Sequence, residues 1–461
     1  MTRYARRSNG EAVICNASSE IGSGGEARIY TVASEANLVA KIYHTPTDLH
    51  AHKLQSMLAN PPDSLGISGS HSTIAWPIDL LVVPGGSRIA GFLMPRVKME
   101  PISEFYHPKT RLNKYPLFHY GYLHRTGRNL ATAVSAVHAK GYVIGDVNES
   151  NILANDQALV SLVDTDSFQV RDHASGMIYR CPVGKMEFTP PELQGQDFSD
   201  IDRSLHHDSF GLAVLLFLLL MEGTHPFAGH FTGNGEPPSI GERIKAGHFP
   251  YGSGPHPYSP GKHTLPFGVL APMLQTLFLR CFEEGYQHPH RRPDAVMWRN
   301  ALQDAESSLT SCQVNSQHLF SSHLPACPWC ERSVQQSIDS FPLSVRQHIP
   351  IVSSQQPLAA LNPSPAALQI PQLQPQHNQQ PTRHVFSLWE VVKFVWKVAR
   401  FIVSYEFGSK NNQQIMIGRL SFLQTIKTAI VFCFLPLLTL VLAAFLAQLV
   451  LLLIAWLFSH I

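Results

Sequence analysis

The sequence predicts an α+β fold for residues 14–308, in which strands come first and helices follow. Three short β-like runs lie at residues 27–32, 38–43 and 89–93, and runs of this kind are typical of strands. One helical face in the second half carries Leu123, Leu130, Val134 and Val137. Gly141 is well placed to end that helix. The wholly apolar run 212–221 is too short to span a bilayer and predicts a buried helix.

Composition narrows the possible partners and the compartment. The 461 residues carry a formal net charge of only +2, so we predict no nucleic-acid partner. Seven cysteines, an odd number, favour a reducing compartment over a disulfide framework. The basic N-terminus is followed by no apolar run, and we therefore expect no signal peptide.

A glycine-rich stretch near the start predicts a phosphate-binding turn. Gly22, Ser23, Gly24 and Gly25 stand between two β-like runs, and glycines let backbone N–H groups approach phosphate oxygens closely. Taken alone, this pattern also fits an ordinary turn between strands. The next β-like run has Lys41 at its centre, where an ammonium facing a cleft can neutralise phosphates; the alternative is a solvated strand lysine.

The spacing of three further polar residues predicts a metal site and a proton acceptor. Asn151 follows Asp146 by five residues, and Asp164 follows Asn151 by thirteen. A carboxylate and a carboxamide supply the oxygen ligands that Mg²⁺ prefers, and a second carboxylate can accept a proton from a hydroxyl. The structural alternative is a loop aspartate with an Asx turn.

With these motifs in this order, residues 14–308 resemble a Ser/Thr protein kinase domain, and more narrowly the divergent bacterial YegI-type kinase-like proteins. Other matching motifs follow the same order: Gly91-Phe-Leu-Met-Pro95, Pro190-Pro-Glu192, Ser209-Phe-Gly211, Gly223-Thr-His-Pro-Phe227 and Arg292-Pro293. The resemblance implies a bilobal kinase-like fold, ATP, and Mg²⁺ or Mn²⁺. It implies that Lys41 holds the α- and β-phosphates, that Asn151 and Asp164 bind the metal, and that Asp146 accepts the proton of a protein hydroxyl.

The nucleotide-binding half departs from the family pattern. Ala27 stands at the third glycine, and Glu26 occupies the loop tip, where it can repel phosphate. No glutamate occurs between Lys41 and Met99, so the usual helix partner of the lysine is missing. Asp48 is the nearest acidic candidate.

The catalytic half departs as well. Gly145 replaces the arginine before the catalytic aspartate, Asn148 replaces a basic residue, and Asp166 replaces a small glycine. His206 stands where the family has an acid, and Asp208 is shifted from that position. The retained residues favour an active kinase, whereas the departures favour a pseudokinase, meaning an ATP-binding or nucleotide-free scaffold.

Two hypotheses follow from these departures. Without an arginine at position 145 the loop lacks the usual clamp for a phosphate, so we predict that phosphorylation is not an on-switch at Thr165, Ser167, Ser175 or Tyr179. Counting back from Glu192 places Lys185 where the family usually has a threonine that contacts the catalytic loop. Lys185 would then restore the positive charge lost at Asn148.

A second cluster predicts a structural zinc module at residues 309–335. Cys312, His318, Cys327 and Cys330 form a Cys₃His set of the kind that binds Zn²⁺ tetrahedrally. His323 is a rival for His318. A redox pair and unliganded thiols are the alternatives, although no thioredoxin-like pattern surrounds the cysteines.

The C-terminal part predicts a linker and two membrane-directed segments. Residues 336–384 are rich in Gln, Pro and Ser and read as a disordered linker. In 385–404 the charges fall on one helical stripe, which fits an interfacial helix or a helix docked on the kinase-like domain. Residues 428–458 carry no formal charge and predict a single transmembrane helix, with a buried core helix as the alternative. Basic residues before this span place the kinase-like domain in the cytoplasm.

Overall fold

The computed structural model describes residues 2–63 and 71–343. The predicted interfacial helix at 385–404, the transmembrane helix at 428–458 and most of the linker at 336–384 lie outside the described residues. In the part of the chain that is described, no helix combines the length and the apolar character needed to cross a membrane.

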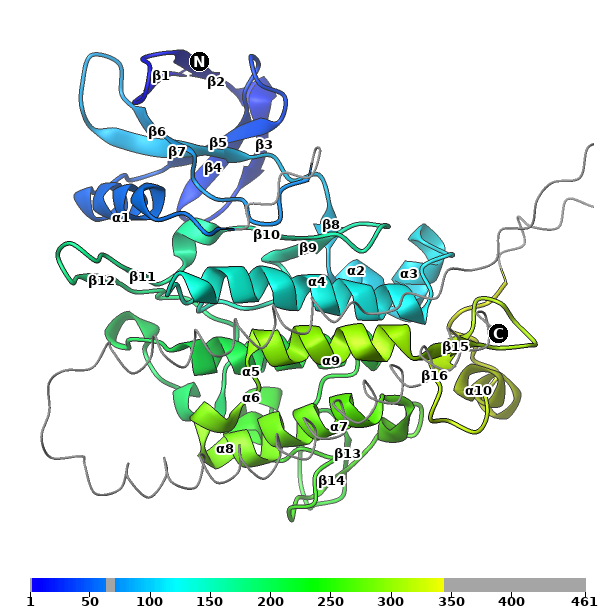
Figure 1. Cartoon of the computed structure of the whole chain (residues 1–461). Helices are drawn as coiled ribbons and strands as arrows, with labels where there is room; N and C mark the ends of the chain where they lie inside the picture. Colours follow the sequence, from blue (N-terminus) through cyan, green and yellow to red (C-terminus); the bar gives the residue numbers. More distant parts are fainter. Residues whose placement is uncertain (1, 64–70, 344–461) are drawn as a thin grey trace, which may run out of the picture. The chain divides into compact units, whose positions relative to one another are not determined.

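The N-terminal part of the chain, up to Pro95, forms a strand-rich lobe, drawn in blue in Figure 1. It is built around a seven-stranded antiparallel sheet with the order β2-β1-β6-β7-β5-β4-β3. Its strands are β1 (Thr2–Arg6), β2 (Ala12–Cys15), β3 (Glu20–Ser23), β4 (Ala27–Thr31), β5 (Leu38–Tyr43), β6 (Asp79–Val82) and β7 (Ile89–Pro95). The three strands predicted at 27–32, 38–43 and 89–93 are confirmed. The sheet begins earlier than residue 14, because the hairpin β1–β2 adds two strands to it.

Side chains of β5 alternate between the two faces of the sheet, and this alternation decides which of them face the helical lobe. Val39 and Tyr43 belong to the main apolar core, whereas Ala40 and Ile42 belong to a second cluster with residues of β2, β6 and β7. Successive side chains of a strand point to opposite faces, so Lys41 lies on the same face as Val39 and Tyr43. Helix α1 (Asp48–Ala59) packs near this strand-rich sheet and contacts β7.

The part of the chain from Ser103 to Ser307 is mainly helical, as predicted. Its helices are α2 (Ser103–Tyr106), α3 (Pro108–Lys114), α4 (Tyr120–Ala139), α5 (Leu205–Leu220), α6 (Ile240–Lys245), α7 (Pro272–Leu279), α8 (Gly285–Gln287) and α9 (Ala295–Ser307). Helix α4 carries the predicted apolar face and packs against α5 and α9 (Figure 1). Gly141 follows α4 with a φ of +78°, which a glycine adopts without strain. The run 212–221 is fully buried in and just after α5.

Short elements connect the helices and surround the site. Three small strands form the sheet β10-β9-β8, with β8 (Glu100–Pro101), β9 (Ile152–Ala154) and β10 (Val160–Leu162). The hairpins are β11 (Val170–Arg171) with β12 (Ile178–Tyr179), and β13 (His230–Phe231) with β14 (Tyr258–Ser259). Single turns of helix lie at η1 (Ala17–Ser19), η2 (Thr165–Ser167), η3 (Met186–Phe188), η4 (Pro191–Leu193), η5 (Phe198–Asp200), η6 (Phe267–Val269), η7 (Arg280–Glu284) and η8 (Pro289–Arg291).

A small module follows α9 and packs against the end of the helical lobe. It consists of the hairpin β15 (Leu309–Ser311) with β16 (Leu319–Ser321) and helix α10 (Pro328–Gln336). Trp329 of α10 is buried and packs edge-on against Tyr120 of α4 and Phe341. The packed chain therefore continues past residue 335 to at least Phe341.

Candidate active site and metal centre

Asp146 and Asn151 lie together in the loop between α4 and β9. The Asn151 amide donates to the backbone carbonyl of Asp146 at 3.1 Å and to its carboxylate Oδ2 at 3.0 Å. The other oxygen, Asp146 Oδ1, is buried and accepts no hydrogen bond from the described residues. One oxygen of this carboxylate is therefore held in place, while the other has the capacity to accept a proton.

The base of this loop is fixed by Asp208 of α5. Its carboxylate accepts hydrogen bonds from the backbone N–H of Ile144 at 2.7 Å and of Gly145 at 2.8 Å. His138 Nε2 lies 2.9 Å from the same carboxylate. Asp208 therefore holds the catalytic loop, although it stands two residues after the position where the family has an acid. His206, which occupies that position, takes no part in the contact.

Asp164 follows β10 and lies beside Asn151 and Lys41. Its backbone is left-handed, with φ +57° and ψ +39°, a conformation that is uncommon outside glycine and tends to occur at functional sites. The Val163 N–H donates to the Asn151 carbonyl at 3.0 Å, which keeps the two predicted metal ligands next to each other. Lys41 Nζ lies 2.6 Å from Asp164 Oδ1.

Lys41 has a second partner that the sequence reading did not assign. Its Nζ also lies 2.6 Å from Asp166 Oδ1, and the Tyr43 hydroxyl donates to Asp166 Oδ2 at 2.9 Å. Burial alone lowers the pKa of Lys41, but the two carboxylates outweigh this effect and hold it above its usual value. Asp48, the candidate partner named from the sequence, forms no ion pair with Lys41 and lines a different cavity.

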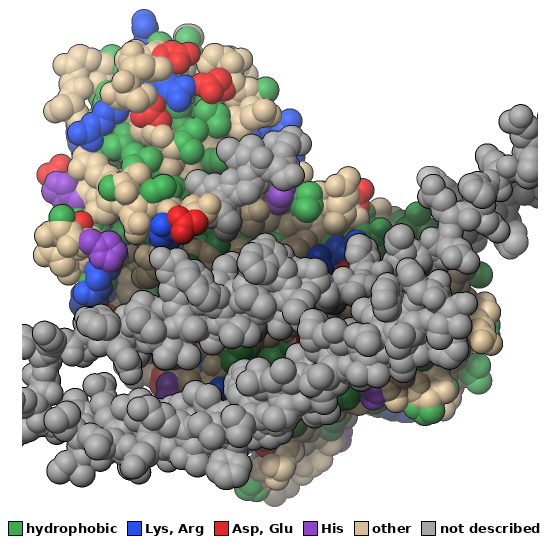
Figure 2. Space-filling view, viewed as in Figure 1, with side chains coloured by type: hydrophobic (Ala, Val, Ile, Leu, Met, Phe, Trp, Pro, Cys, Tyr) green, Lys and Arg blue, Asp and Glu red, His purple; other side chains and the backbone are tan. Residues whose placement is uncertain are grey.

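Lys41, Tyr43, Asp164 and Asp166 line a cavity of about 460 Å³ between β3–β4, α1 and the segment after β10, whereas Asp146 and Asn151 are not part of its lining. Of the four predicted phosphate-binding residues, Gly24 and Gly25 line it, whereas Gly22 and Ser23 lie in β3. Glu26 also lines the cavity, as its place at the loop tip suggested. On the face shown in Figure 2, acidic and basic side chains are mixed over the strand-rich lobe, in keeping with the small net charge.

Close packing at Gly91 keeps Lys41 in register. Gly91 of β7 pairs with Ile42 of β5, and a Cβ atom at position 91 would lie 2.0 Å from the Lys41 carbonyl oxygen. Any side chain at this position would push β5 away.

Lys185 contacts the catalytic loop, as predicted, through different residues. Its Nζ lies 2.9 Å from Glu149 Oε1 and 2.7 Å from Ser150 Oγ. The ammonium therefore contacts the two residues that follow Asn148 in the sequence, and its ion pair is with Glu149. About two-fifths of the Lys185 side chain is exposed, so solvent screens this ion pair.

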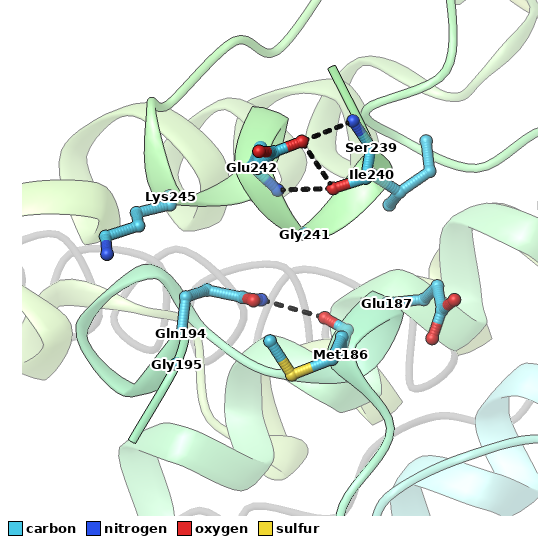
Figure 3. A pocket seen from close by; sticks show the side chains of 9 residues that line it. All are labelled: Met186, Glu187, Gln194, Gly195, Ser239, Ile240, Gly241, Glu242 and Lys245. Carbon is cyan, nitrogen blue, oxygen red and sulfur yellow. Dashed lines mark hydrogen bonds between the residues drawn. The ribbon is translucent and has the colours of Figure 1, made fainter.

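A second cavity, of about 450 Å³, is lined by Met186, the residue that follows Lys185 (Figure 3). It lies between η3, η4 and α6. Its lining combines Met186 and Ile240 with Glu187, Glu242 and Lys245. Figure 3 shows Gln194 reaching across to the Met186 carbonyl, a hydrogen bond of 2.8 Å.

A buried arginine occupies the space left by Gly145. The Arg203 guanidinium donates to the carbonyl oxygens of Gly145 and, at 2.6 Å, Val183, and it stacks 4.0 Å above the Phe198 ring. Gly145 has a φ of +75°, and a Cβ there would lie 2.7 Å from the Cys181 Cβ. Arg203 thus joins the catalytic loop to the segment that follows β12.

The predicted metal ligands come together. One donor atom from each of Cys312, His318, Cys327 and Cys330 lies within 4.8 Å of the others. His318 Nδ1 is 3.4 Å from Cys330 Sγ, and Cys312 Sγ is 3.5 Å from Cys330 Sγ. A tetrahedral Zn²⁺ with bonds of about 2.3 Å separates its sulfur ligands by roughly 3.8 Å, so the donor set fits this ion.

The far side of His318 is held by Asp339. His318 Nε2 lies 2.9 Å from both Asp339 Oδ1 and Asn315 Nδ2. Because a carboxylate only accepts, the Asp339 contact favours the tautomer with the proton on Nε2, which leaves Nδ1 free for a metal. His323, the rival ligand, instead bonds Ser321 Oγ at 2.8 Å and the Gly268 carbonyl at 3.0 Å. His318 is therefore the histidine that belongs to the cluster.

The sequence did not predict four contributors to these sites. The partners of Asp166, Arg203 and Asp339 lie elsewhere in the sequence, and Lys53 belongs to no motif. One signal was available for Lys53: it shares a helical face with Met57, four residues later, which is fully buried.

Comparison with known proteins supports the resemblance. No family model matches the chain. The chain is 34% identical over 316 residues to protein kinase YegI of Escherichia coli (strain K12), and 35% identical over 323 residues to protein kinase YegI of Escherichia coli O157:H7. Over this region the chain is a homologue of protein kinase YegI. Each match covers 68% of the chain.

The match covers only part of these relatives. The chain spans 48%, about half, of the length of the curated relatives it matches. Among solved structures, the ROP18 kinase domain in complex with AMP-PNP and sucrose aligns with a TM-score of 0.44 and 17% identity, over 66% of this chain and 84% of that one. The homology to YegI agrees with the protein-kinase-like α+β fold that the sequence predicts.

Proposed function

We propose that this chain is an ATP-dependent Ser/Thr protein kinase that transfers the γ-phosphoryl group of ATP to protein hydroxyls. The observation that carries this proposal is the convergence of Lys41, from the strand-rich lobe, with Asp146, Asn151 and Asp164 from the helical lobe; Lys41 and Asp164 are 123 residues apart. Asn151 bonds Asp146, Lys41 bonds Asp164, and Asn151 accepts from the residue before Asp164. The homology to YegI supports the same reaction.

Each of these residues has a role that its position allows. Lys41 and the Gly24-Gly25 turn bind the phosphates at one end of the cavity. Asn151 and Asp164 hold Mg²⁺ or Mn²⁺, which when bound offsets phosphate charge. Asp146 orients the substrate hydroxyl and accepts its proton through Oδ1. Positioning and charge stabilisation account for most of the catalysis in this kind of transfer.

The second cavity is where we place the protein substrate. Lys185 bonds Ser150 of the catalytic loop, and the next residue, Met186, lines the cavity. A peptide leaving Asp146 would cross Lys185 and reach this space. Ile240→Arg should lower phosphorylation of a general acceptor protein at least tenfold and leave ATP binding unchanged; equal phosphorylation would refute the placement.

The test of the proposed activity is phosphate transfer from labelled ATP with Mg²⁺ or Mn²⁺ to acceptor protein. The full chain in detergent should be used, because truncation at residue 335 would remove Asp339. We expect transfer by the wild type and its loss in both Asp146→Ala and Asp164→Ala. Transfer that survives both substitutions would contradict the proposal.

The second candidate is a pseudokinase scaffold. One observation favours it: Glu26 brings negative charge into the phosphate cavity. Tight ATP binding by the wild type without transfer to any acceptor would establish this candidate instead.

We further propose that the Cys312, His318, Cys327 and Cys330 cluster binds a structural Zn²⁺. The buried His318 with its Asp339 partner and the Cys₃His donor set support it. Purified protein should contain about one zinc per chain. Cys327→Ser should lose the metal, and the control Cys15→Ser, in the strand-rich lobe, should retain it. A metal-free wild type would refute the site.

We also propose that the C-terminal segment anchors the chain to a membrane. The support is the sequence of 428–458, with 31 residues and no formal charge, and the basic residues before it. The full chain should stay in membranes through an alkaline carbonate wash, and a chain ending at residue 384 should not. Release of the full chain by this wash would refute the anchor.

A further inference from the structure

The positioning of Lys41 does not involve an acid from helix α1. Both oxygens of Asp166 are taken by residues of β5, with Lys41 Nζ on Oδ1 and the Tyr43 hydroxyl on Oδ2. Only 5% of the Asp166 side chain is exposed. The single acid of α1 is Asp48 in the first turn, and no ion pair joins it to Lys41 among the described residues.

Helix α1 instead contributes a lysine to the same cavity. Lys53 is 9% exposed and lines the cavity with Lys41, Asp164 and Asp166. Within residues 2–63 and 71–343, its ammonium forms neither an ion pair nor a side-chain hydrogen bond. Most of the Lys53 side chain is buried, while its Nζ opens onto the cavity. An ammonium at a cavity wall without a carboxylate partner is placed to bind an anionic ligand there.

The charges of the cavity show which ligand fits. Three carboxylates, Glu26, Asp164 and Asp166, line it together with two lysines. Arg180 also lines it but is paired with Asp202. Because Lys41 is held between two carboxylates, the Lys53 ammonium is the lysine charge that no carboxylate among the described residues pairs. It reduces the repulsion that a polyphosphate meets from the three carboxylates of the cavity.

We propose that Asp166 positions Lys41, and that Lys53 of helix α1 is a second lysine that binds the phosphates of ATP. The inference rests on the proposed ATP-dependent function. Asp166 lies on the same short turn as Asp164, so the position of Lys41 is tied to the metal-binding residue and does not depend on α1. Because Asp166 supplies the acid for Lys41, the face of α1 that lines the cavity is able to carry a cation, Lys53.

The first test compares ligands with and without phosphates, using the full chain. Dissociation constants for Mg–ATP and for adenosine are measured for the wild type, Lys53→Met, Lys53→Arg and the control His52→Gln on the exposed face of α1. Loss of a charge-assisted contact should raise the Mg–ATP constant about tenfold or more in Lys53→Met. The adenosine constant should not change, and Lys53→Arg should stay within about threefold of the wild type.

The outcomes separate the possible roles. Equal changes for Mg–ATP and adenosine, or no change for either, would overturn the role of Lys53. Since Lys53→Met removes an unpaired buried charge, its midpoint of thermal unfolding should equal or exceed that of the wild type, and a marked drop would point to a structural lysine. Wild-type protein that binds Mg–ATP without transferring phosphate would contradict the kinase proposal alone. A wild type that binds no Mg–ATP would overturn both.

The second test addresses Asp166. In Asp166→Asn, Lys41 is left with Asp164 as its charged partner and competes there with the metal. The Mg²⁺ concentration needed for half-maximal ATP binding should rise about fivefold or more, with adenosine binding unchanged. An unaltered Mg²⁺ requirement would show that Asp166 does not position Lys41.

Discussion

The ion pair between Glu192 and Arg292 should be among the largest single contributions to the stability of the helical lobe. Its two contacts are parallel, with Nη1 to Oε1 and Nη2 to Oε2 both at 2.7 Å. The Arg292 side chain is fully buried. It also donates to the carbonyl oxygens of His206 at 3.1 Å and Gly285 at 3.0 Å.

The substitution Glu192→Gln should cost about 3 kcal/mol in the free energy of unfolding. Removing one partner of a buried pair typically costs about 3–5 kcal/mol, because the other charge is left uncompensated. The lower end applies here, since 29% of the Glu192 side chain is exposed and water can approach Arg292. Removing both charges, in Glu192→Gln with Arg292→Met, should cost less than the sum of the single losses.

Urea unfolding at neutral pH measures the effect, with Asp202→Asn as the matched control. Asp202 pairs with Arg180 at 2.7 Å, but both side chains are more than two-fifths exposed, so its loss should be below about 1 kcal/mol. If Glu192→Gln and Asp202→Asn destabilise the protein equally, the argument from burial is wrong.

Three further predictions concern catalysis, pH and regulation. Lys185→Ala should lower turnover about tenfold while leaving ATP affinity nearly unchanged, as steady-state kinetics will show; unchanged turnover would exclude a catalytic contribution from this charge. Burial lowers the pKa of His124 to about 4, so the unfolded chain binds a proton first as the pH falls below about 6.5. Urea titrations should therefore show about 2 kcal/mol less stability at pH 5 than at pH 7 from this residue, a difference missing in His124→Gln. Phosphatase treatment should leave kinase activity intact, and its abolition by that treatment would refute the absence of an activating phosphate.

The residues that the sequence could predict are those whose roles depend on local order. Lys41 was identifiable because strand periodicity fixes its face, and Asp146, Asn151 and Asp164 because their spacing spans one loop and one hairpin. Likewise, the close spacing of Cys327 and Cys330, with Cys312 and His318 shortly before them, was enough to predict the Cys₃His cluster.

The partners of these residues could not be predicted in the same way. Lys41 meets Asp166 across 125 residues, and Arg203 meets Gly145 across 58. Such pairs depend on tertiary packing, between the lobes for Lys41 and within the helical lobe for Arg203, and neither periodicity nor motif spacing carries that information. The extension of the sheet by β1 could not be predicted either, because this strand has five residues, two of them arginines, and no apolar run that would indicate a strand between β2 and β6.

The three departures of the catalytic region each come with a local replacement. Arg203 and Cys181 fill the space at Gly145 so completely that an arginine side chain could not be accommodated there. Asn148 is buried and bonds the Asp146 carbonyl and the Ser150 N–H, which braces the loop from within. Asp166 engages Lys41.

Compensation at all three places is not expected of a site that has merely lost its function, since a scaffold needs neither a braced loop nor a positioned lysine. The same contacts bear on regulation. The two terminal nitrogens of Arg203 donate hydrogen bonds to the carbonyl oxygens of Gly145 and Val183. This guanidinium therefore holds the segment after β12 against the catalytic loop without the help of a phosphate. A kinase built in this way would be active as folded, and control would have to act on access to the site or on the availability of its substrate.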